Sequence, residues 1–575
     1  MAFIEQYEVI WPALLVAVPL VGAMLAVLTA RAARPVVFAS IVLMAALSLA
    51  VVARLSHAGA YRVAIGGWDA PLGIAFAIDG LSAAFIVVTA VVMACVMLAG
   101  LPKFAPQLSA ATLPPPVSSP AGAAERRRGR GSSREVDAAA RLGARDERHG
   151  WIPFPALRAA GDDTNGGAEV GGAGSVATVA ASNSETRAGY AFIPLALLLW
   201  AALNAVFLSG DLFNLYVALE LLTLSAIALV AIEGKAAMIA AAIRYALFAL
   251  FGSLAYLLGA AMLYAVYGTL DMSLLAEQIT PDAMTIAAGA LMTAGLAAKT
   301  ALFPFHAWLP PAHSGAPAPA SAMLSALVPK ASFYIVVRIW FDVMPHEAGE
   351  IMPVIMGVLG SCAIVYGSVL AIRQERLKLV VAYSTVAQLG YLFLVFPLAG
   401  GGGDPQPWAA GAWTGGMFHA FSHALAKAAM FLCAGLFMEA VGHDRIAGLR
   451  GIARHLPMTA FAFALAAITL MGLPPSGGFT AKYLLLTASF AGGQIGWAVV
   501  MMIGGLLAAV YLFRPLTYTF AKEGMEAKEL VTLPRARQLL PLILASLAII
   551  LGIASAAPYD FLQIGRPEAA EEGLD

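Results

Sequence analysis

Apolar residues fill the chain in blocks of about 20 residues, long enough for a helix to cross a bilayer core about 30 Å thick. About fourteen such blocks are predicted, near residues 9–30, 36–54, 81–101, 191–209, 212–232, 236–266, 284–303, 320–341, 351–372, 377–398, 408–438, 458–490, 494–518 and 538–556. Because lipid offers the backbone no hydrogen-bond partner, each block must form a helix. The pattern predicts an all-α, polytopic membrane protein.

Two stretches interrupt this helical pattern. The block at 458–490 exceeds one straight crossing and contains Gly472, Pro474 and Pro475, which predict a broken helix. A second proline-rich run, which includes Pro304, follows Lys299 and predicts another break. Residues 61–78 alternate apolar and polar positions between glycines, so we expect a small exterior hairpin there.

Residues 102–189 do not belong to the bilayer pattern. They are rich in Ala, Gly, Ser, Pro and Arg and lack hydrophobic periodicity, so a disordered cytoplasmic insertion is predicted. Its basic cluster could touch anionic lipid headgroups. A tolerated loop insertion is the favoured interpretation.

Composition supports a membrane protein and excludes several other classes. Hydrophobic residues make up 61% of the chain and charged residues 12%, against about 25% charged in soluble domains. The net charge of zero gives no reason to expect a nucleic-acid partner. Cys95, Cys362 and Cys433 all lie in apolar blocks and form no CxxC pair, so no metal site and no cofactor are predicted. The N-terminus lacks signal-peptide features, so we expect the first block to remain as a span.

The distribution of Lys and Arg predicts an orientation. With the N-terminus outside, the inside loops collect Arg31, Arg34, Lys235, Arg373, Arg376, Lys378, Arg445, Arg450, Arg454, Lys522, Lys528, Arg535 and Arg537. The outside segments hold only Arg54, Arg62 and Arg566. Because basic residues favour the cytoplasmic side, we expect a multi-pass protein of the inner (plasma) membrane with both termini exterior.

Several charged residues lie within the apolar blocks, where each costs at least about 2.5–3.5 kcal/mol if it faces lipid. Glu220 lies about 12 Å into its block, and Lys299 and Lys330 lie in later blocks. Desolvation disfavours a charged lysine and a nearby carboxylate favours it. A lysine poised between these effects can hold or release a proton. The alternatives are a structural ion pair for Glu220 and snorkelling for Lys330.

Three further candidates share one helix face: His419, His423 and Lys427, spaced four residues apart. Histidine titrates closest to working pH, so a proton relay is favoured over packing residues or a metal site. Lys482 follows the predicted break at 472–478, and broken helices expose backbone groups where ion sites form.

Three more residues are possible relay groups: His306, His313 and Asp211. For the two histidines, relay and structural polarity are equally favoured. Asp79 and Asp211 sit at span ends, where each could cap the following helix; for Asp211, capping is preferred over a place in a proton exit. The remaining arginines in the blocks, Arg244, Arg338 and Arg514, keep their charge at any working pH and are expected to be anchors or counter-ions.

Several motifs together resemble the antiporter-like subunits shared by respiratory complex I, Mrp-type cation/proton antiporters and membrane-bound hydrogenases. They are AIDGLSAAF, GDLFNLYVALELL, AAKTALFPFHAWLPPAHSGAPAPASAMLSALVPKASFY, YSTVAQLGYL, FHAFSHALAKAAMFL and GLPPSGGFTAKYLL. GDLFNLYVALE is most similar to the D-type subunit of Mrp antiporters. HAWLPPAH departs from the family's usual LPDAH, with Pro311 where an acid is common.

The resemblance implies fourteen helices with two inverted five-helix repeats. The expected organisation is 1–101 (three helices and the hairpin), the insertion 102–189, repeats 190–341 and 351–518, and a C-terminal helix and tail at 519–575. It also implies a Glu220–Lys299 ion pair in one half channel. Lys330, His419, His423 and Lys427 would form a central axis, with Lys482 at the second half channel.

The implied activity is translocation of protons, or of Na⁺ against protons, beside other membrane subunits of an Mrp-type complex. The alternative is a proton-pumping subunit of an NADH-quinone oxidoreductase or membrane-bound hydrogenase. In that enzyme complex, this chain would do no redox chemistry itself. A third possibility is a scaffold whose charges only hold helices together.

Overall fold

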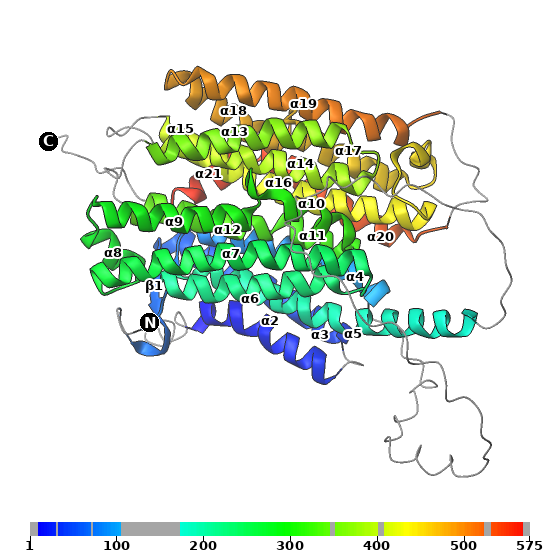
Figure 1. Ribbon diagram of the computed structural model, residues 1–575, viewed down its shortest axis with the longest axis horizontal. Helices are drawn as coiled ribbons and strands as arrows, with labels where there is room; N and C mark the ends of the chain where they lie inside the picture. Colours follow the sequence, from blue (N-terminus) through cyan, green and yellow to red (C-terminus); the bar gives the residue numbers. More distant parts are fainter. Residues whose placement is uncertain are drawn as a thin grey trace, which may run out of the picture. The chain divides into compact units, whose positions relative to one another are not determined.

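The computed structural model describes residues 10–29, 33–68, 70, 73–104, 173–344, 351–400, 408–522 and 531–566. The chain divides into two units, Met1–Pro106 with Asn183–Asp575, and Gln107–Ser182. The helices of the membrane pattern belong to the first unit, where Figure 1 shows them running alongside one another. Most of the predicted insertion 102–189 lies outside the described residues.

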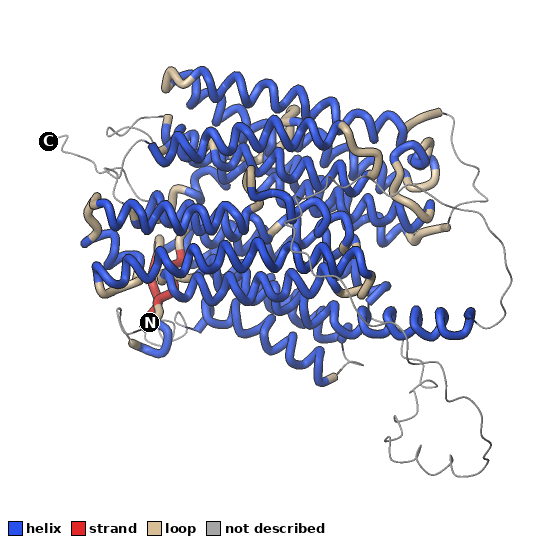
Figure 2. Tube along the Cα trace, viewed as in Figure 1, coloured by secondary structure: helices blue, strands red, loops and turns tan. Residues whose placement is uncertain are grey.

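The N-terminal part contains three helices, α2 (Ile10–Leu28), α3 (Ala33–Ala58) and α4 (Gly80–Phe104). Between α3 and α4, β1 (Tyr61–Ala64) pairs antiparallel with β2 (Ala75–Ile78), with Tyr61 opposite Ile78, and η2 (Ile65–Gly67) follows β1. Figure 2 shows these two strands among the helices. The predicted hairpin is therefore present.

The first predicted repeat contains α5 (Ala173–Leu208), α6 (Leu212–Ala231), α7 (Ala236–Tyr267), α8 (Met272–Gln278), α9 (Ala283–Thr300), η4 (Phe305–Trp308), α10 (Leu309–Gly315), α11 (Ala318–Ala326), α12 (Val328–Arg338) and η5 (Ile339–Val343), a π-helical turn. Helix α5 begins inside the segment predicted to be disordered, and residues 102–104 complete α4. Alanine-rich sequence such as 173–189 favours helix, which a prediction based on low hydrophobicity overlooks.

The second predicted repeat contains α13 (Ile351–Ile372), α14 (Leu377–Phe393), α15 (Val395–Ala399), α16 (Ala409–Val441), η6 (Ile446–Leu449), η7 (Ile452–Arg454), α17 (Pro457–Met471), α18 (Gly477–Ala491) and α19 (Ile495–Thr519). The C-terminal part adds α20 (Arg535–Ile553) and α21 (Ala556–Leu562). Helix α16 packs against α4, α11, α14, α17, α18 and α20, so it lies in the interior of the unit. The division into two repeats stays a prediction.

Among the described residues, 13 helices are long and apolar enough to cross a membrane, or up to 14 if one bent pair counts as a span. The predicted number of spans is thus confirmed. The central span Ala318–Val343 is entirely buried inside the protein, whereas only about a third of Ile10–Leu28 and of Ala33–Ala58 is buried. Exposed apolar side chains on such outer helices suit contact with lipid.

Helix ends follow local sequence signals. Asp211, Asp271 and Asp282 accept hydrogen bonds from backbone N–H groups at the starts of α6, α8 and α9, as N-caps do. Gly268 and Gly442 adopt the left-handed conformation that ends α7 and α16.

Prolines explain the breaks within spans. The predicted break at 472–478 separates α17 from α18, which are two distinct helices rather than one long one. Two breaks were not predicted: α11 and α12 meet at Leu327, and α14 and α15 meet at Leu394. Each lies two or three residues before a proline, Pro329 or Pro397, which has no N–H to donate four residues back.

Two glycines bring α7 and α9 unusually close. A Cβ on Gly295 would lie 2.3 Å from the carbonyl oxygen of Gly252, and one on Gly252 would lie 3.0 Å from Cγ of Lys299. Small residues allow such close helix packing in membranes. This contact presses Lys299 against its neighbours on α7.

A charged cluster lies where α6 turns into α7. Glu233 accepts from Lys103 Nζ at 2.9 Å and from Lys235 Nζ at 2.8 Å. Burial raises the pKa of the Glu233 carboxyl, but the two lysines outweigh it, so its pKa lies below the ordinary value of 4.5. The cluster joins the end of α4 to this loop.

Candidate functional site

Glu220 and Lys299 form an ion pair between α6 and α9, as the resemblance implied. Nζ of Lys299 lies 2.7 Å from Oε1 of Glu220 and 3.0 Å from the hydroxyl of Thr223. Ser253 on α7 also donates to Glu220. Lys299 is buried, while the Glu220 side chain is 30% exposed. Lys299 lies in the last turn of α9, where the helix dipole favours a cation.

Lys330 is buried one turn after the break between α11 and α12. Its Nζ donates to the carbonyl oxygen of Ser325 at 2.6 Å. In an unbroken helix that carbonyl would accept from the N–H of residue 329, but this residue is Pro329 and has none. The break therefore supplies the acceptor that the ammonium needs.

Lys482 on α18 likewise donates to backbone carbonyls that prolines leave without an N–H donor. Its Nζ donates to the carbonyls of Leu470 at 2.9 Å and Met471 at 3.2 Å, at the end of α17. Their usual donors would be the N–H groups of residues 474 and 475, which are both prolines. Nζ also lies 4.6 Å from the ring centroid of Tyr391, within range of a cation–π interaction.

His419, His423 and Lys427 are all buried on α16. The two imidazole rings lie 5.9 Å apart, and Nε2 of His419 lies 3.0 Å from the carbonyl oxygen of Gln388. Lys427 donates to the carbonyl of Val381 at 2.9 Å and to the hydroxyl of Ser384. The structure places these three side chains in line through the interior.

His313 on α10 lies beside this group, and the charges of Lys330, Lys427 and Lys378 all act on it. The charges of Lys330, Lys427 and Lys482 likewise act on His423. Among the described residues, neither ring nitrogen of His313 or of His423 has a hydrogen-bond partner. His313 and His423 are therefore buried imidazoles without hydrogen-bond partners among the described residues, and His313 lies against α16 with its ring 6.1 Å from that of Phe431.

Lys378 belongs to this interior, although the sequence placed it in a cytoplasmic loop. It is buried in the first turn of α14, and its Nζ donates to the carbonyl of Ala316. Counting charges between blocks cannot reveal such burial, because Lys378 follows Arg376 closely and resembles a loop residue.

The structure does not join Lys299 directly to the central group. Within the described chain, no hydrogen bond links Lys299 to Lys330 or His313. Trp308 contacts both regions, because its Nε1 donates to the carbonyl of Ala298 and its ring meets His313 edge-on. His306 lies apart as well, with its ring 5.0 Å from that of Tyr366 on α13.

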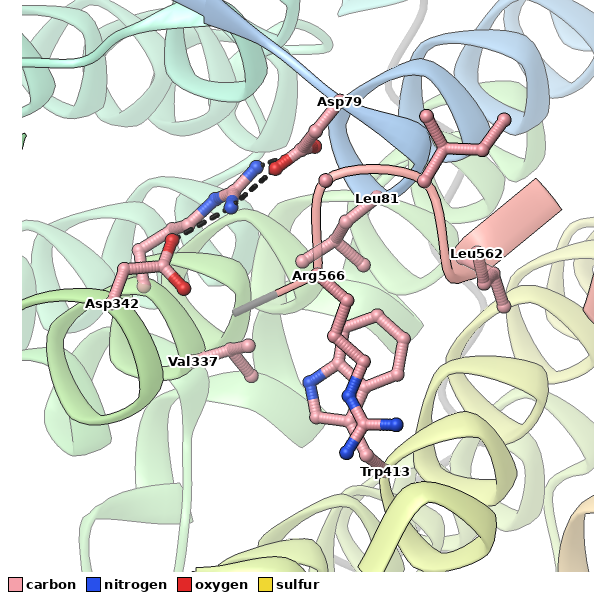
Figure 3. Close-up of a pocket in the computed structure, with 10 residues that line it drawn as sticks. Asp79, Leu81, Val337, Asp342, Trp413, Leu562 and Arg566 are labelled. Carbon is pink, nitrogen blue, oxygen red and sulfur yellow. Dashed lines mark hydrogen bonds and ion pairs between the residues drawn. The ribbon is translucent and has the colours of Figure 1, made fainter. Parts of the chain in front are cut away.

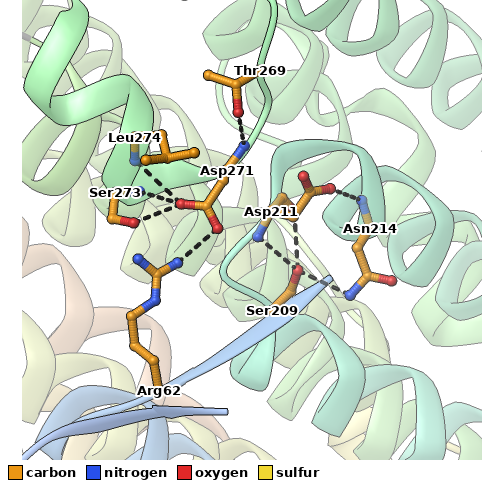
Figure 4. A network of polar contacts seen from close by, with 8 residues as sticks. All are labelled: Arg62, Ser209, Asp211, Asn214, Thr269, Asp271, Ser273 and Leu274. Carbon is orange, nitrogen blue, oxygen red and sulfur yellow. Dashed lines mark hydrogen bonds and ion pairs between the residues drawn. The ribbon is translucent and has the colours of Figure 1, made fainter. Parts of the chain in front are cut away.

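Asp211 caps α6, which confirms the preferred interpretation of this residue. Its carboxylate accepts from the Asn214 N–H at 2.7 Å, beside Asp271, whose carboxylate pairs with Arg62 at 2.9 Å (Figure 4). Burial raises the pKa of Asp211, and the charge of Asp271 adds to this effect against the backbone hydrogen bonds. Within the described residues, no hydrogen bond joins Asp211 to Glu220, nine residues further along the chain.

Asp79 accepts from the Ser82 N–H at 2.8 Å and also pairs with Arg338. Arg338 is thus a counter-ion, as predicted. Arg514 donates to the carbonyls of Ile372 and Gln374, and Arg244 is exposed on α7. In the described parts of the chain, no three His, Cys, Asp or Glu side chains gather as metal ligands would.

A family profile described as "NADH:quinone oxidoreductase/Mrp antiporter, TM" matches residues 209–510, which include most of the helices above. The chain belongs to this family. The predicted family is therefore confirmed. The match spans Glu220, Lys299, Lys330, His419, His423, Lys427 and Lys482, but it assigns no role to any of them.

Individual members of the NADH:quinone oxidoreductase/Mrp antiporter family are similar over part of the chain. NADH-quinone oxidoreductase subunit N of Desulforudis audaxviator is 38% identical over 336 residues, 58% of this chain and 65% of that protein. The D-type subunit of the Na⁺/H⁺ antiporter of Alkalihalophilus pseudofirmus is 29% identical over 382 residues, 66% of this chain and 76% of that protein. The chain thus matches slightly less than two thirds of the first relative's length.

A chain in the structure of the Mrp complex from Dietzia sp. has the same fold. The TM-score is 0.75 at 23% identity, and the alignment covers 97% of this chain and 98% of that one. The predicted fold class, a polytopic antiporter-like subunit with broken helices, is confirmed.

Proposed function

We propose that the chain is a proton- or Na⁺/proton-translocating subunit of a multisubunit Mrp-type cation/proton antiporter in the inner (plasma) membrane, with both ends exterior. Its family includes antiporter and oxidoreductase subunits that are named as parts of larger complexes. Partners would be other membrane subunits, and the transported species protons with or without Na⁺.

One observation carries this proposal: among the described residues, Lys330, Lys427 and Lys482 are buried without a carboxylate within ion-pair distance. Each instead donates to backbone carbonyls. A structural ion pair that loses its lysine charge leaves an unpaired buried acid, which costs about 3–5 kcal/mol. A lysine held by carbonyls can change its charge without leaving such an acid.

The proposed path follows these contacts. A proton enters at Glu220 and Lys299 and changes the charge of that pair. It then passes through Lys330 and along α16 through Lys427, His423 and His419 to Lys482, since His419 and Lys482 both lie against the ring of Tyr391. It leaves the protein there, with His313 beside the path. Water would carry the proton from Lys299 to the central group, since no described side-chain hydrogen bond joins them. A membrane potential supplies about 2.3 kcal/mol per charge per 100 mV.

The test is driven proton flux in membrane vesicles that contain the assembled complex. Lys299→Ala is expected to abolish flux while the complex still assembles. Lys235→Ala removes an exposed lysine from the same unit and serves as the matched control, with flux unchanged. Wild-type flux in the Lys299 variant would refute the proposal.

The alternative function is proton pumping within an NADH-quinone oxidoreductase or membrane-bound hydrogenase, and the similarity to an NADH-quinone oxidoreductase subunit favours it. Copurification separates the two. Small antiporter subunits would accompany an antiporter component, whereas iron–sulfur and quinone-site subunits would accompany an oxidoreductase component.

A further inference from the structure

Four side chains spaced four residues apart lie along one face of α12 and η5: Lys330, Tyr334, Arg338 and Asp342. This spacing places successive groups about 6 Å apart along the helix axis. Tyr334 is buried, donates its hydroxyl to the carbonyl of Phe207 at 2.8 Å and accepts from Nε of Arg338 at 2.9 Å. Polar side chains thus follow one face of the span in a line from Lys330 to its end at Asp342.

The guanidinium of Arg338 occupies the end of that line. It contacts both carboxylate oxygens of Asp79 at 2.7 Å and one oxygen of Asp342 at 2.7 Å (Figure 3). Arg338 is only 5% exposed. Two acids from separate segments therefore hold one cation where the line would otherwise reach the surface.

The C-terminal segment after α21 covers the same end of the helices. The Gly80 N–H donates to the carbonyl of Ile564 at 2.9 Å, and Gln563 donates to the hydroxyl of Thr414 at 3.1 Å. The guanidinium of Arg566 lies 5.4 Å from the ring centroid of Trp413. Arg338 and Arg566 both line the small cavity between these elements, and Figure 3 shows Arg566 beside Trp413.

We propose that Arg338 seals this end of the central lysine–histidine group against passive proton leak, an inference that rests on the proposed function. Arginine stays protonated at any working pH and cannot pass a proton on. A fixed cation in a narrow path also repels protons and cations. The two carboxylates beyond Tyr334 are occupied by the guanidinium, so neither serves as a free acceptor.

Loss of the Arg338 guanidinium would provide proton acceptors at this end of the span. Asp79 and Asp342 would become free carboxylates next to the Tyr334 hydroxyl and could take up protons from the central group. A unit charge about 6 Å away changes proton occupancy about a hundredfold at an effective dielectric constant of about 20. Asp79 and Asp342 carry two negative charges against the one positive charge of Arg338, so the net effect is well below this figure, and the expected rise in passive proton permeability is about tenfold.

The experiment measures proton leak at rest, in vesicles containing the assembled complex, after a pH jump and without a driving gradient of other ions. Arg338→Gln is expected to leak and Arg338→Lys, which keeps the charge, to stay tight. Arg244→Gln removes an exposed arginine from α7 and controls for the loss of any arginine.

The proposal is overturned if Arg338→Gln is as tight as wild type, or if the Lys variant leaks equally. If Arg338→Gln does not assemble, the double variant Asp79→Asn, Arg338→Gln removes one buried charge of each sign and keeps the Asp342 carboxylate as a free acceptor. Leak in this variant supports the seal, and tightness refutes it. Since Lys299→Ala reports driven flux and Arg338→Gln reports resting leak, each can fail without the other.

Discussion

A double-mutant cycle on Glu220 and Lys299 separates transport from scaffolding. The variants are Glu220→Gln, Lys299→Met and the two combined. Breaking a buried ion pair from one side typically costs about 3–5 kcal/mol, whereas replacing both partners is often neutral. Because the Glu220 side chain is 30% exposed, water recovers part of the loss, and we expect about 2–3 kcal/mol for each single variant.

The structure predicts that the two single variants lose different amounts of stability. Lys299→Met leaves the carboxylate with Ser253 and with partial exposure. Glu220→Gln leaves a buried ammonium with only the Thr223 hydroxyl and an amide. The Glu220 variant is therefore expected to be the less stable single variant. The double variant should regain most of the loss, giving a coupling energy with a magnitude of about 4 kcal/mol.

Two assays read the cycle. Thermal inactivation of the solubilised complex at a fixed scan rate ranks stability, because large membrane proteins rarely unfold reversibly. Proton flux in vesicles reports transport. We expect the double variant to assemble and melt near wild type but to carry no flux. If it regains both stability and flux, the pair only holds helices together and the proton path is wrong.

Three further predictions use single positions. Asp211→Asn should keep flux and stability, because Asn also caps helices, whereas Asp211→Ala should lose about 1 kcal/mol of stability; lost flux in the Asn variant would place the carboxyl in the proton path. Glu233 has a lowered pKa in the folded protein, so its contribution to stability is complete above pH 4.5 and is lost as the pH falls through that lowered pKa. The difference in melting temperature between wild type and Glu233→Gln should therefore shrink as the pH is lowered below 4.5. Pro329→Ala restores an N–H for the carbonyl that Lys330 uses, so flux should fall with no loss of helix stability, while Pro319→Ala, in the first turn of α11, should leave flux unchanged.

The spans could be predicted because lipid demands long apolar helices, and their number survives comparison with the structure. Side-chain partners far apart in the sequence could not. Nothing in the spacing of Asp79 and Arg338, 259 residues apart, indicates that they touch. The Glu220–Lys299 pair followed only from the family resemblance. The burial of Lys378 could not be predicted either, because its charge indicated a loop and the carbonyl that accepts its hydrogen bond lies 62 residues away in the sequence.

The buried lysines are of two kinds, and prolines make the difference. Lys299 faces a carboxylate, so its charge is tied to that of Glu220. Lys330 and Lys482 face carbonyls that prolines have freed from helix hydrogen bonding. A carbonyl stabilises an ammonium but carries no net charge of its own. Lys330 and Lys482 can therefore lose a proton at lower electrostatic cost than a lysine that is paired with a carboxylate. A proton that reaches Lys330 is therefore not held by a neighbouring carboxylate. The charge state of the Glu220–Lys299 pair then determines when that proton moves on.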